Sequence, residues 1–301
     1  MGDFIIFMFY LEDLLGWVAV FIISINAFNM WTLDGEEHIA TTSITTNKDI
    51  VKNEILVNLT SSIGGSYKEN GIRIPCALDG SNHFLEHIRK YLPENSKCLI
   101  LSSDPENEEM NDSFKNVFKE AFKISNLPLS KIDVCDRRNE NNLADILYDY
   151  DVVLLAGGHV PTQNQFFSRI NLKELLIGYE GIIIGISAGT MNCADVVYAQ
   201  PELDGEAIDH QYQRYLEGLN LTRINVLPHF QEIKNLTVDG LRILEDISLP
   251  DSKKRPFYAL VDGSYIFVDD NKSTLYGEGY WVQSGTITKI CDTYKSIELV
   301  P

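Results

Sequence analysis

The chain has 301 residues, of which 45% are apolar and 23% charged, an ordinary balance for a protein that folds into one large or two modest domains. Its 43 acidic residues outnumber the 25 basic ones, which gives a formal net charge of −18. A field of this sign repels phosphate backbones, so the composition argues against nucleic acid as a partner. The five cysteines are scattered and form no Cys-x-x-Cys pair, which predicts reduced thiols in a cytoplasmic protein.

The first 52 residues form a hydrophobic extension whose composition differs from that of the rest. Residues 14–33 are an uncharged run, LLGWVAVFIISINAFNMWTL, long enough to cross a bilayer as a helix. No Lys or Arg precedes Lys48, so the basic start of a signal peptide is missing. The extension is therefore expected to be a membrane anchor, a loosely packed segment or a stretch upstream of the true start. As an anchor, it would place the following domain on the cytoplasmic side, where Lys48 and Lys52 lie.

From residue 53 onward, short β-branched runs alternate with amphipathic stretches, which is the pattern of βαβ units around a parallel sheet. Strands are expected at 54–62, 97–103, 131–136, 151–158 and 181–187, and helices at 83–92, 112–125, 140–150 and 162–176. The strands are almost continuous apolar runs, which is typical of strands covered on both faces.

The sequence pattern changes again from about Phe257. Turn signals at Asp262-Gly263, Asp270-Asn271 and Ser284-Gly285 separate β-rich runs and predict antiparallel hairpins that close one edge of the sheet. Because no repeat or low-complexity tract interrupts the chain, 53–301 is predicted to form one α/β domain.

One serine stands in a context that favours nucleophilic catalysis. Gly185-Ile186-Ser187-Ala188-Gly189 is a G-x-S-x-G sequence at the end of an apolar strand and before a predicted helix, as a nucleophile elbow requires. The small neighbours would leave the Ser187 hydroxyl uncovered, and the helix N-terminus would direct N–H groups at developing negative charge. The alternative is a tight turn whose serine only caps the helix.

A serine hydroxyl is a poor nucleophile without a base, and His229 in INVLPHFQE is the best candidate. It follows the run RINVL, and a strand there would end at the same sheet edge as Ser187. The alternative is a loop histidine without a role. The imidazole needs an acid to orient it, for which we expect Glu202 in the loop AQPELDGEAID. The rivals in the same loop are Asp204, Glu206 and Asp209.

A tetrahedral intermediate also needs hydrogen-bond donors for its oxyanion. Gly157 and Gly158 end the strand expected at 151–158, where a backbone N–H can approach a reacting carbonyl unhindered. The N–H groups of Gly158 and of Ala188, the residue after the serine, would form a hole with two donors. An ordinary glycine turn before a helix is the alternative.

Taken together, these residues resemble the serine peptidases of the dipeptidase E (aspartyl dipeptidase) and cyanophycinase family. The resemblance covers about 53–301 and is carried by AGGHVPTQ, GISAGTMN, LPHF and YALVDGSYIFVDD. It implies a three-layer α/β sandwich with a mainly parallel sheet, like that of class I glutamine amidotransferases, and C-terminal antiparallel hairpins. It also implies a nucleophile at Ser187, a base at His229, an acid at Glu202, and a small peptide as substrate, without a cofactor or metal.

Two segments depart from the dipeptidase pattern. Aspartyl dipeptidases hold the acidic side chain of the substrate with an arginine shortly after the histidine, and neither Lys234 nor Arg242 clearly matches it. Preference for an N-terminal aspartate is therefore open. The glycine turn continues into HVPTQNQ, so Gly157, His159 and Gln163 are expected to line the substrate pocket, with a capped loop residue as the alternative for His159.

Three other functions fit parts of the same sequence. The segment HFLEH (83–87) matches the H-x-x-E-H arrangement of some zinc enzymes, which would place two histidines on one helix face. An α/β-hydrolase esterase shares the elbow, but the interval between Ser187 and His229 is too short for its usual elements. A non-catalytic binding protein on the same fold would leave the serine idle.

Overall fold

The computed structural model of the chain describes residues 56–269 and 272–299. The extension at 1–52, with its uncharged run at 14–33, lies outside these residues, so the expectation of a membrane anchor concerns a part of the chain that is not described. Within the described ranges, every helix is too short or too polar to traverse a bilayer.

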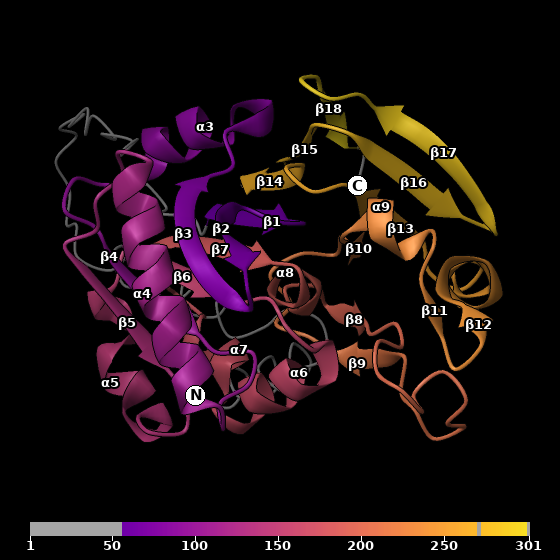
Figure 1. Cartoon of the computed structure of the whole chain (residues 1–301), viewed down its shortest axis with the longest axis horizontal. Coiled ribbons are helices and arrows are strands. Elements are labelled where there is room, and N and C mark those ends of the chain that lie inside the picture. Colours follow the sequence, from indigo (N-terminus) through magenta and orange to yellow (C-terminus); the bar gives the residue numbers. More distant parts are fainter. Residues whose placement is uncertain (1–55, 270–271, 300–301) are drawn as a thin grey trace, which may run out of the picture. The chain divides into compact units, whose positions relative to one another are not determined.

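An eight-stranded central sheet carries the fold, in the order β18-β15-β14-β1-β7-β6-β4-β5 (Figure 1). The parallel part consists of β1 (Leu56–Thr60), β7 (Ile182–Ile186), β6 (Val152–Leu155), β4 (Lys97–Leu101) and β5 (Lys131–Cys135). The antiparallel edge beyond β1 consists of β14 (Tyr265–Asp269), β15 (Lys272–Tyr276) and β18 (Ser296–Leu299). The mainly parallel sheet and its antiparallel C-terminal edge confirm the fold expected from the sequence.

The parallel strands are buried on both faces, as their continuous apolar runs predict. Successive residues of a strand point to opposite faces of the sheet. In β4, Leu99 and Leu101 accordingly belong to one core cluster, whereas Cys98 and Ile100 belong to another. The sheet therefore needs a layer of helices on each side.

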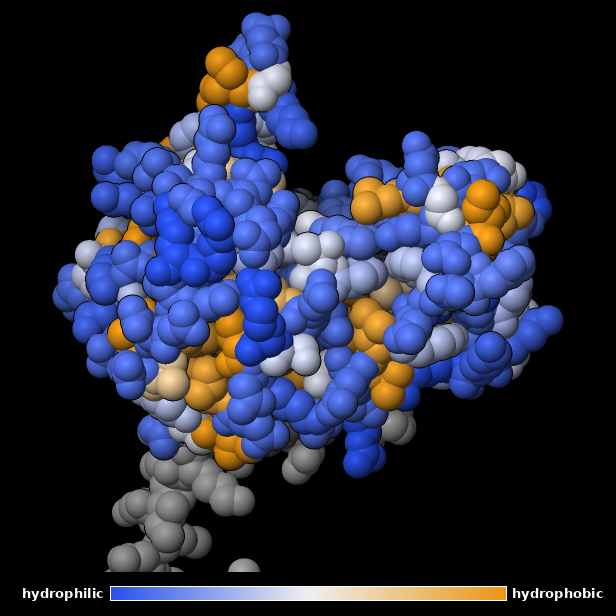
Figure 2. Space-filling model, turned by 90° about the horizontal axis from the view of Figure 1, so that it is seen from below, coloured by the Kyte–Doolittle hydropathy of each residue, from blue (hydrophilic) through white to orange (hydrophobic). Residues whose placement is uncertain are grey.

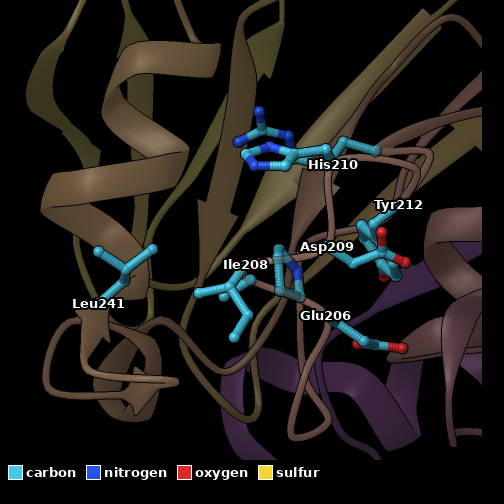
Figure 3. Close-up of a pocket in the computed structure, with 9 residues that line it drawn as sticks. Glu206, Ile208, Asp209, His210, Tyr212 and Leu241 are labelled. Carbon is cyan, nitrogen blue, oxygen red and sulfur yellow. The ribbon is translucent and has the colours of Figure 1, made fainter.

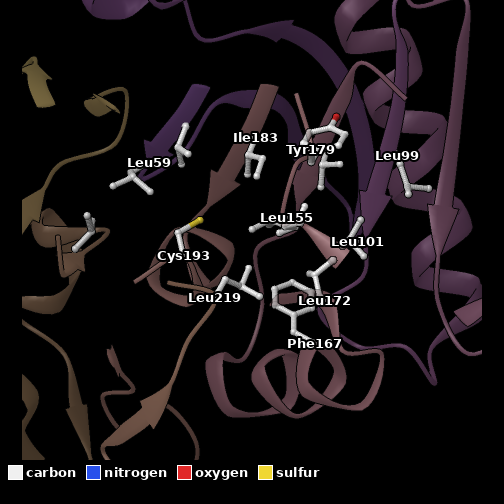
Figure 4. Close-up of a cluster of buried hydrophobic side chains, with 14 of the residues drawn as sticks. Leu59, Leu99, Leu101, Leu155, Phe167, Leu172, Tyr179, Ile183, Cys193 and Leu219 are labelled. Atoms are coloured by element: carbon white, nitrogen blue, oxygen red, sulfur yellow. The ribbon is translucent and has the colours of Figure 1, made fainter. Parts of the chain in front are cut away.

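Helices supply both layers. The first cluster packs the sheet against α5 (Leu143–Ile146), α6 (Val160–Arg169) and α7 (Leu172–Leu175), as the close-up in Figure 4 shows for Phe167 and Leu172. The second cluster packs it against α3 (Phe84–Tyr91) and α4 (Glu108–Ile124). The result is the three-layer sandwich that the family resemblance implies.

Some helix boundaries differ from those expected. Helix α4 begins at Glu108 because the Asn107 side chain caps it by accepting from the Met110 N–H. The helix expected at 162–176 divides into α6 and α7 at Asn171, whose φ of 52° is left-handed. The stretch 140–150 forms short helical turns, η2 (Glu140–Asn142), α5 and η3 (Leu147–Asp149), instead of one helix.

A second sheet, which the sequence did not indicate, has the order β10-β13-β16-β17. It contains β10 (Val226–Leu227), β13 (Phe257–Leu260), β16 (Gly279–Gln283) and β17 (Thr286–Cys291). Since β10 and β13 are parallel neighbours, the segments that follow them leave the sheet at the same end. The C-terminal strands therefore divide between two sheets instead of all closing one edge.

The remaining elements are short and connect these layers. The strand pairs are β2 (Gly64–Glu69) with β3 (Ile72–Leu78), β8 (Val196–Tyr198) with β9 (Tyr215–Glu217), and β11 (Thr237–Val238) with β12 (Leu241–Arg242). The helical turns are η1 (Ser81–His83), α8 (Ala188–Asn192), α9 (Phe230–Ile233), η4 (Ile243–Ser248) and α10 (Leu249–Asp251). Figure 2 shows that one face of the molecule is mostly hydrophilic, with smaller apolar patches between the charged residues.

Candidate active site

Ser187 lies on a sharp turn between β7 and α8. Its φ of 50° and ψ of −110° are unusual for a residue with a side chain, and such backbone strain is typical of functional turns. The turn requires glycine on both sides of Ser187, because a side chain would clash there. A Cβ on Gly189 would lie 2.2 Å from the Leu155 carbonyl oxygen, and one on Gly185 would lie 2.7 Å from Cα of Thr190. The strand–turn–helix context expected for a nucleophile elbow is therefore present.

His229 faces this serine. It lies two residues after β10, at the N-cap of α9, and its Nε2 lies 2.9 Å from Oγ of Ser187. The backbone of His229 is left-handed, with a φ of 54° and a ψ of 38°. The fold thus brings together the two residues that the sequence analysis selected as nucleophile and base.

The acid on the other side of the imidazole is Asp262. Its Oδ1 lies 2.7 Å from Nδ1 of His229. Asp262 follows β13, the parallel neighbour of β10, so the sheet brings the two strand ends together. The assignment of Glu202 to this position is therefore corrected, because Asp262 occupies the place beside Nδ1. None of the rivals in the acidic loop occupies that place either, which excludes Asp204, Glu206 and Asp209.

The sequence analysis used Asp262 as part of a turn signal and of the motif YALVDGSYIFVDD, and gave it no role beside the imidazole. A signal for its role was nevertheless present, since Asp262 follows the buried run FYAL almost directly. An acid at the carboxyl end of a buried strand is a candidate for the same sheet edge as Ser187 and His229. What the sequence did not indicate was that β13 would pair beside β10.

The electrostatics of the pair suit an acid that orients a base. Burial raises the pKa of Asp262, but hydrogen bonds from His229 and Ser61 outweigh it and lower the pKa below its ordinary value. Burial lowers the pKa of His229, but the hydrogen bond and charge of Asp262 outweigh this effect and raise it. Asp262 is therefore ionised, and its charge stabilises the imidazolium.

Glu202 borders the site without orienting the imidazole. Burial, followed by the charge of Glu206, raises the pKa of Glu202 to about 7. The two acids are linked, because the Glu202 N–H donates to Oε2 of Glu206 over 2.8 Å. The charges of Glu202 and His229 interact, which places the carboxyl near the imidazole. Beside Glu202, Oε1 of Gln200 is buried and has no hydrogen-bond partner among the described residues.

The glycine turn lies against the serine. A Cβ on Gly157 would lie 3.4 Å from Cβ of Ser187. The Gly157 carbonyl accepts a hydrogen bond of 2.8 Å from Oγ of Ser103. Because a trans peptide group is planar, the N–H of Gly158 points away from Ser103, opposite to that carbonyl. Helix α8 begins at Ala188 without a side-chain cap, so its first N–H groups are available to a ligand.

The two polar residues expected to line the pocket behave differently. His159 is partly exposed, with Nε2 2.8 Å from Oε1 of Glu206 and Nδ1 2.8 Å from Oγ1 of Thr162. Gln163 is fully buried, and its Nε2 donates to the Ala156 carbonyl over 2.7 Å. The expectation for Gln163 is therefore wrong, because it lies on the buried face of α6 and supports the glycine turn.

A cavity of about 520 Å³ opens beside the acidic loop (Figure 3). Its lining includes Glu206, His210, Tyr212 and Arg214. Glu206 also contacts His159, so the cavity lies beside that histidine, but its lining includes none of Ser187, His229 and Asp262.

The HFLEH segment does not form the arrangement that the zinc alternative requires. His83 precedes α3 with a left-handed φ of 63°, so His83 and His87 do not share a helix face. His87 is buried, with Nδ1 3.1 Å from the Tyr265 hydroxyl and its ring against Phe267. Across 56–269 and 272–299, no three His, Cys, Asp or Glu side chains are grouped to hold a metal ion.

Comparisons with known proteins relate the chain to one peptidase family. Residues 66–276 match the sequence model of peptidase family S51. None of the curated proteins matches the chain. A solved structure from Listeria monocytogenes EGD-e, described as a candidate peptidase E protein, is 14% identical with a TM-score of 0.46, over 78% of this chain and 98% of that one.

Proposed function

The chain belongs to peptidase family S51, and from this premise we propose that it is a serine peptidase that hydrolyses small peptides through Ser187, His229 and Asp262. The observation that carries the proposal is one continuous chain of hydrogen bonds. Asp262 Oδ1 lies 2.7 Å from His229 Nδ1, and His229 Nε2 lies 2.9 Å from Ser187 Oγ. Nucleophile, base and orienting acid are thus in the order that a catalytic triad requires.

Each residue of the triad has one task. Ser187 Oγ attacks the scissile carbonyl while Nε2 of His229 takes its proton, and the same nitrogen then returns the proton to the leaving amine. Water then attacks the acyl-enzyme while His229 takes its proton, and His229 returns the proton to Ser187 Oγ as the acid product leaves. Asp262 stays ionised throughout, holds the tautomer with the proton on Nδ1, and stabilises the imidazolium.

The oxyanion of the tetrahedral intermediate would be held by the N–H groups of Gly158 and Ala188. The contact of Gly157 with Ser187 places the glycine turn beside the reacting atom. The bond from Ser103 to the Gly157 carbonyl supports this role, because it turns the N–H of Gly158 away from Ser103. Donors that are oriented before the reaction stabilise the developing charge without reorganisation.

A preference for short peptides follows from the groups beside the triad. A half-buried carboxyl with a pKa of about 7, Glu202, lies next to the unsatisfied Oε1 of Gln200. Both groups accept hydrogen bonds, so they suit the ammonium group of a peptide's first residue. Binding of that cation would keep Glu202 ionised. His159, held by Glu206, would border the same space.

Two measurements test the proposal. A fluorophosphonate probe should label Ser187 in the wild type and should fail to label Ser187→Ala and His229→Ala. A dipeptide library, compared with simple esters, should then show turnover of peptides with a free N-terminus. Labelling that persists in Ser187→Ala would overturn the nucleophile, and turnover of esters alone would indicate an esterase.

A further inference from the structure

Ser61 connects the acid and the base of the triad. It follows β1 directly, in the middle of the central sheet between β7 and β14, and it is 0% exposed. Its Oγ donates to Oδ1 of Asp262 over 2.7 Å and accepts from the backbone N–H of His229 over 2.8 Å. One buried hydroxyl therefore uses both its donor and its acceptor capacity on the catalytic residues.

The bond to Asp262 fixes the carboxylate that faces the imidazole. Oδ1 is the oxygen that lies 2.7 Å from Nδ1 of His229, so the same atom accepts from both Ser61 and the imidazole. Two donors from different directions restrict rotation of the carboxyl group. The hydroxyl also favours the ionised form, since its hydrogen bond contributes to the lowered pKa of Asp262.

The bond to His229 fixes the backbone from which the imidazole projects. His229 has a left-handed φ of 54°, which a residue with a side chain adopts only where its surroundings hold it. On the C-terminal side, the His229 carbonyl accepts from the N–H groups of Glu232 and Ile233 in α9. On the N-terminal side, the backbone N–H of His229 donates to Oγ of Ser61. Ser61 therefore restrains the backbone of this strained residue on its N-terminal side.

The residue before Ser61 holds the nucleophile in the same way. The carbonyl of Thr60 accepts from the Ser187 N–H over 3.1 Å and from Oγ1 of Thr190 over 2.8 Å. Two consecutive residues at the end of β1 thus fix the elbow on one side and the acid–base pair on the other. A small displacement of either side would lengthen the bond between His229 and Ser187, on which reactivity depends.

We propose that Ser61 is a positioning residue that holds Asp262 and His229 in their reactive geometry, an inference that rests on the proposed triad. It touches neither substrate nor reacting atoms and acts only through its two partners. Its removal should therefore affect kcat and leave substrate binding unchanged.

The first test is Ser61→Ala, with Ser264→Ala as the matched control. Ser264 is also a buried serine close to the same strand end, since its carbonyl accepts from the Ser61 N–H, but its Oγ has no partner among the described residues. We expect kcat of Ser61→Ala to fall roughly 10–100-fold with KM within about twofold, because one hydrogen bond to the Asp262 carboxylate and one from the His229 backbone are lost. The control should keep wild-type kcat. Equal kcat in Ser61→Ala and wild type would overturn the proposal.

A double-mutant cycle separates positioning from a general structural effect. If Ser61 acts through the acid, Ser61→Ala should lower activity by less than about threefold in an Asp262→Asn background. A structural role, or action through the His229 backbone alone, predicts the same loss in both backgrounds, and that result would refute the positioning of Asp262 by Ser61. The downfield proton resonance of His229 Nδ1–H gives a second readout, and we expect it to weaken in Ser61→Ala and to persist in Ser264→Ala.

Two further outcomes are distinguishable. Absence of fluorophosphonate labelling in the wild type would reject the proposed triad itself, whereas equally fast labelling of wild type and Ser61→Ala would reject only the role of Ser61. Should Ser61→Ala fail to fold, Ser61→Cys decides, because a thiol fills similar space but is a weak donor and acceptor. We expect folded Ser61→Cys to lose kcat, and wild-type kcat in this variant would overturn the proposal.

Discussion

Replacing Asp262 by Asn should reduce activity far more than replacing Glu202 by Gln. Asp262→Asn preserves the shape of the side chain but removes the charge that faces Nδ1 of His229 at 2.7 Å. An amide can also present an N–H to Nδ1 and so favour the wrong tautomer of the imidazole. For a triad acid, this substitution costs about 10⁴ in kcat, which corresponds to roughly 5.5 kcal/mol of transition-state stabilisation.

Glu202→Gln should have a much smaller effect on kcat, below about tenfold, because Glu202 does not occupy the position beside Nδ1. Its negative charge raises the pKa of His229, so its removal should lower that pKa and shift the acidic limb of the pH profile to lower pH. If Glu202 binds the ammonium group of the substrate, KM for dipeptides should rise as well.

The rate of fluorophosphonate labelling at Ser187 measures the reactivity of the nucleophile without knowledge of the peptide. It should be determined for wild type, Asp262→Asn and Glu202→Gln across the pH range, with circular dichroism to verify folding and the preferred dipeptide to give kcat and KM. Losses of equal size in the two variants, or a larger loss in Glu202→Gln, would refute the assignment of Asp262 as the orienting acid.

Three further predictions concern the same site. The acidic limb of the pH profile of kcat/KM should lie above pH 6.5, because the pKa of His229 is raised from its ordinary value of 6.5 and activity is lost as the pH falls through that pKa. A limb below pH 6.5 would contradict a raised pKa. Ser103→Ala should lower kcat by about 10–100-fold at similar KM, because the peptide that carries the Gly158 N–H loses its anchor; an unchanged kcat would argue against an oxyanion role for that N–H. Gly189→Ala should destabilise the fold by about 3 kcal/mol, a decrease in Tm of roughly 6–12 °C, because the new Cβ meets the Leu155 carbonyl oxygen. Gly80→Ala is the control for thermal denaturation, since only Leu85 lies near its Cβ, at 3.6 Å.

The amino-acid sequence by itself determined the class of fold and the nature of the elbow. Continuous apolar runs such as VVLL of β6 require a strand covered on both faces, and alternation with helical stretches requires a parallel sheet. The small residues around Ser187 likewise restrict that segment to a sharp turn between strand and helix. These properties depend on neighbours in the chain, so they can be predicted without coordinates.

Only the tertiary structure decided which residues surround the imidazole. Asp262 faces His229 because β13 pairs beside β10, and Ser61 reaches both because β1 ends between β7 and β14. Gln163 is buried because one face of α6 packs on the sheet, although its polarity predicted a place in the pocket. Pairing and packing between distant segments are set by the whole core, and an acidic loop close to the serine in sequence gives no information about them. For this reason Ser187 could be selected as the candidate nucleophile from local pattern, whereas proposing Asp262 instead of Glu202 as the acid required the arrangement of the strands.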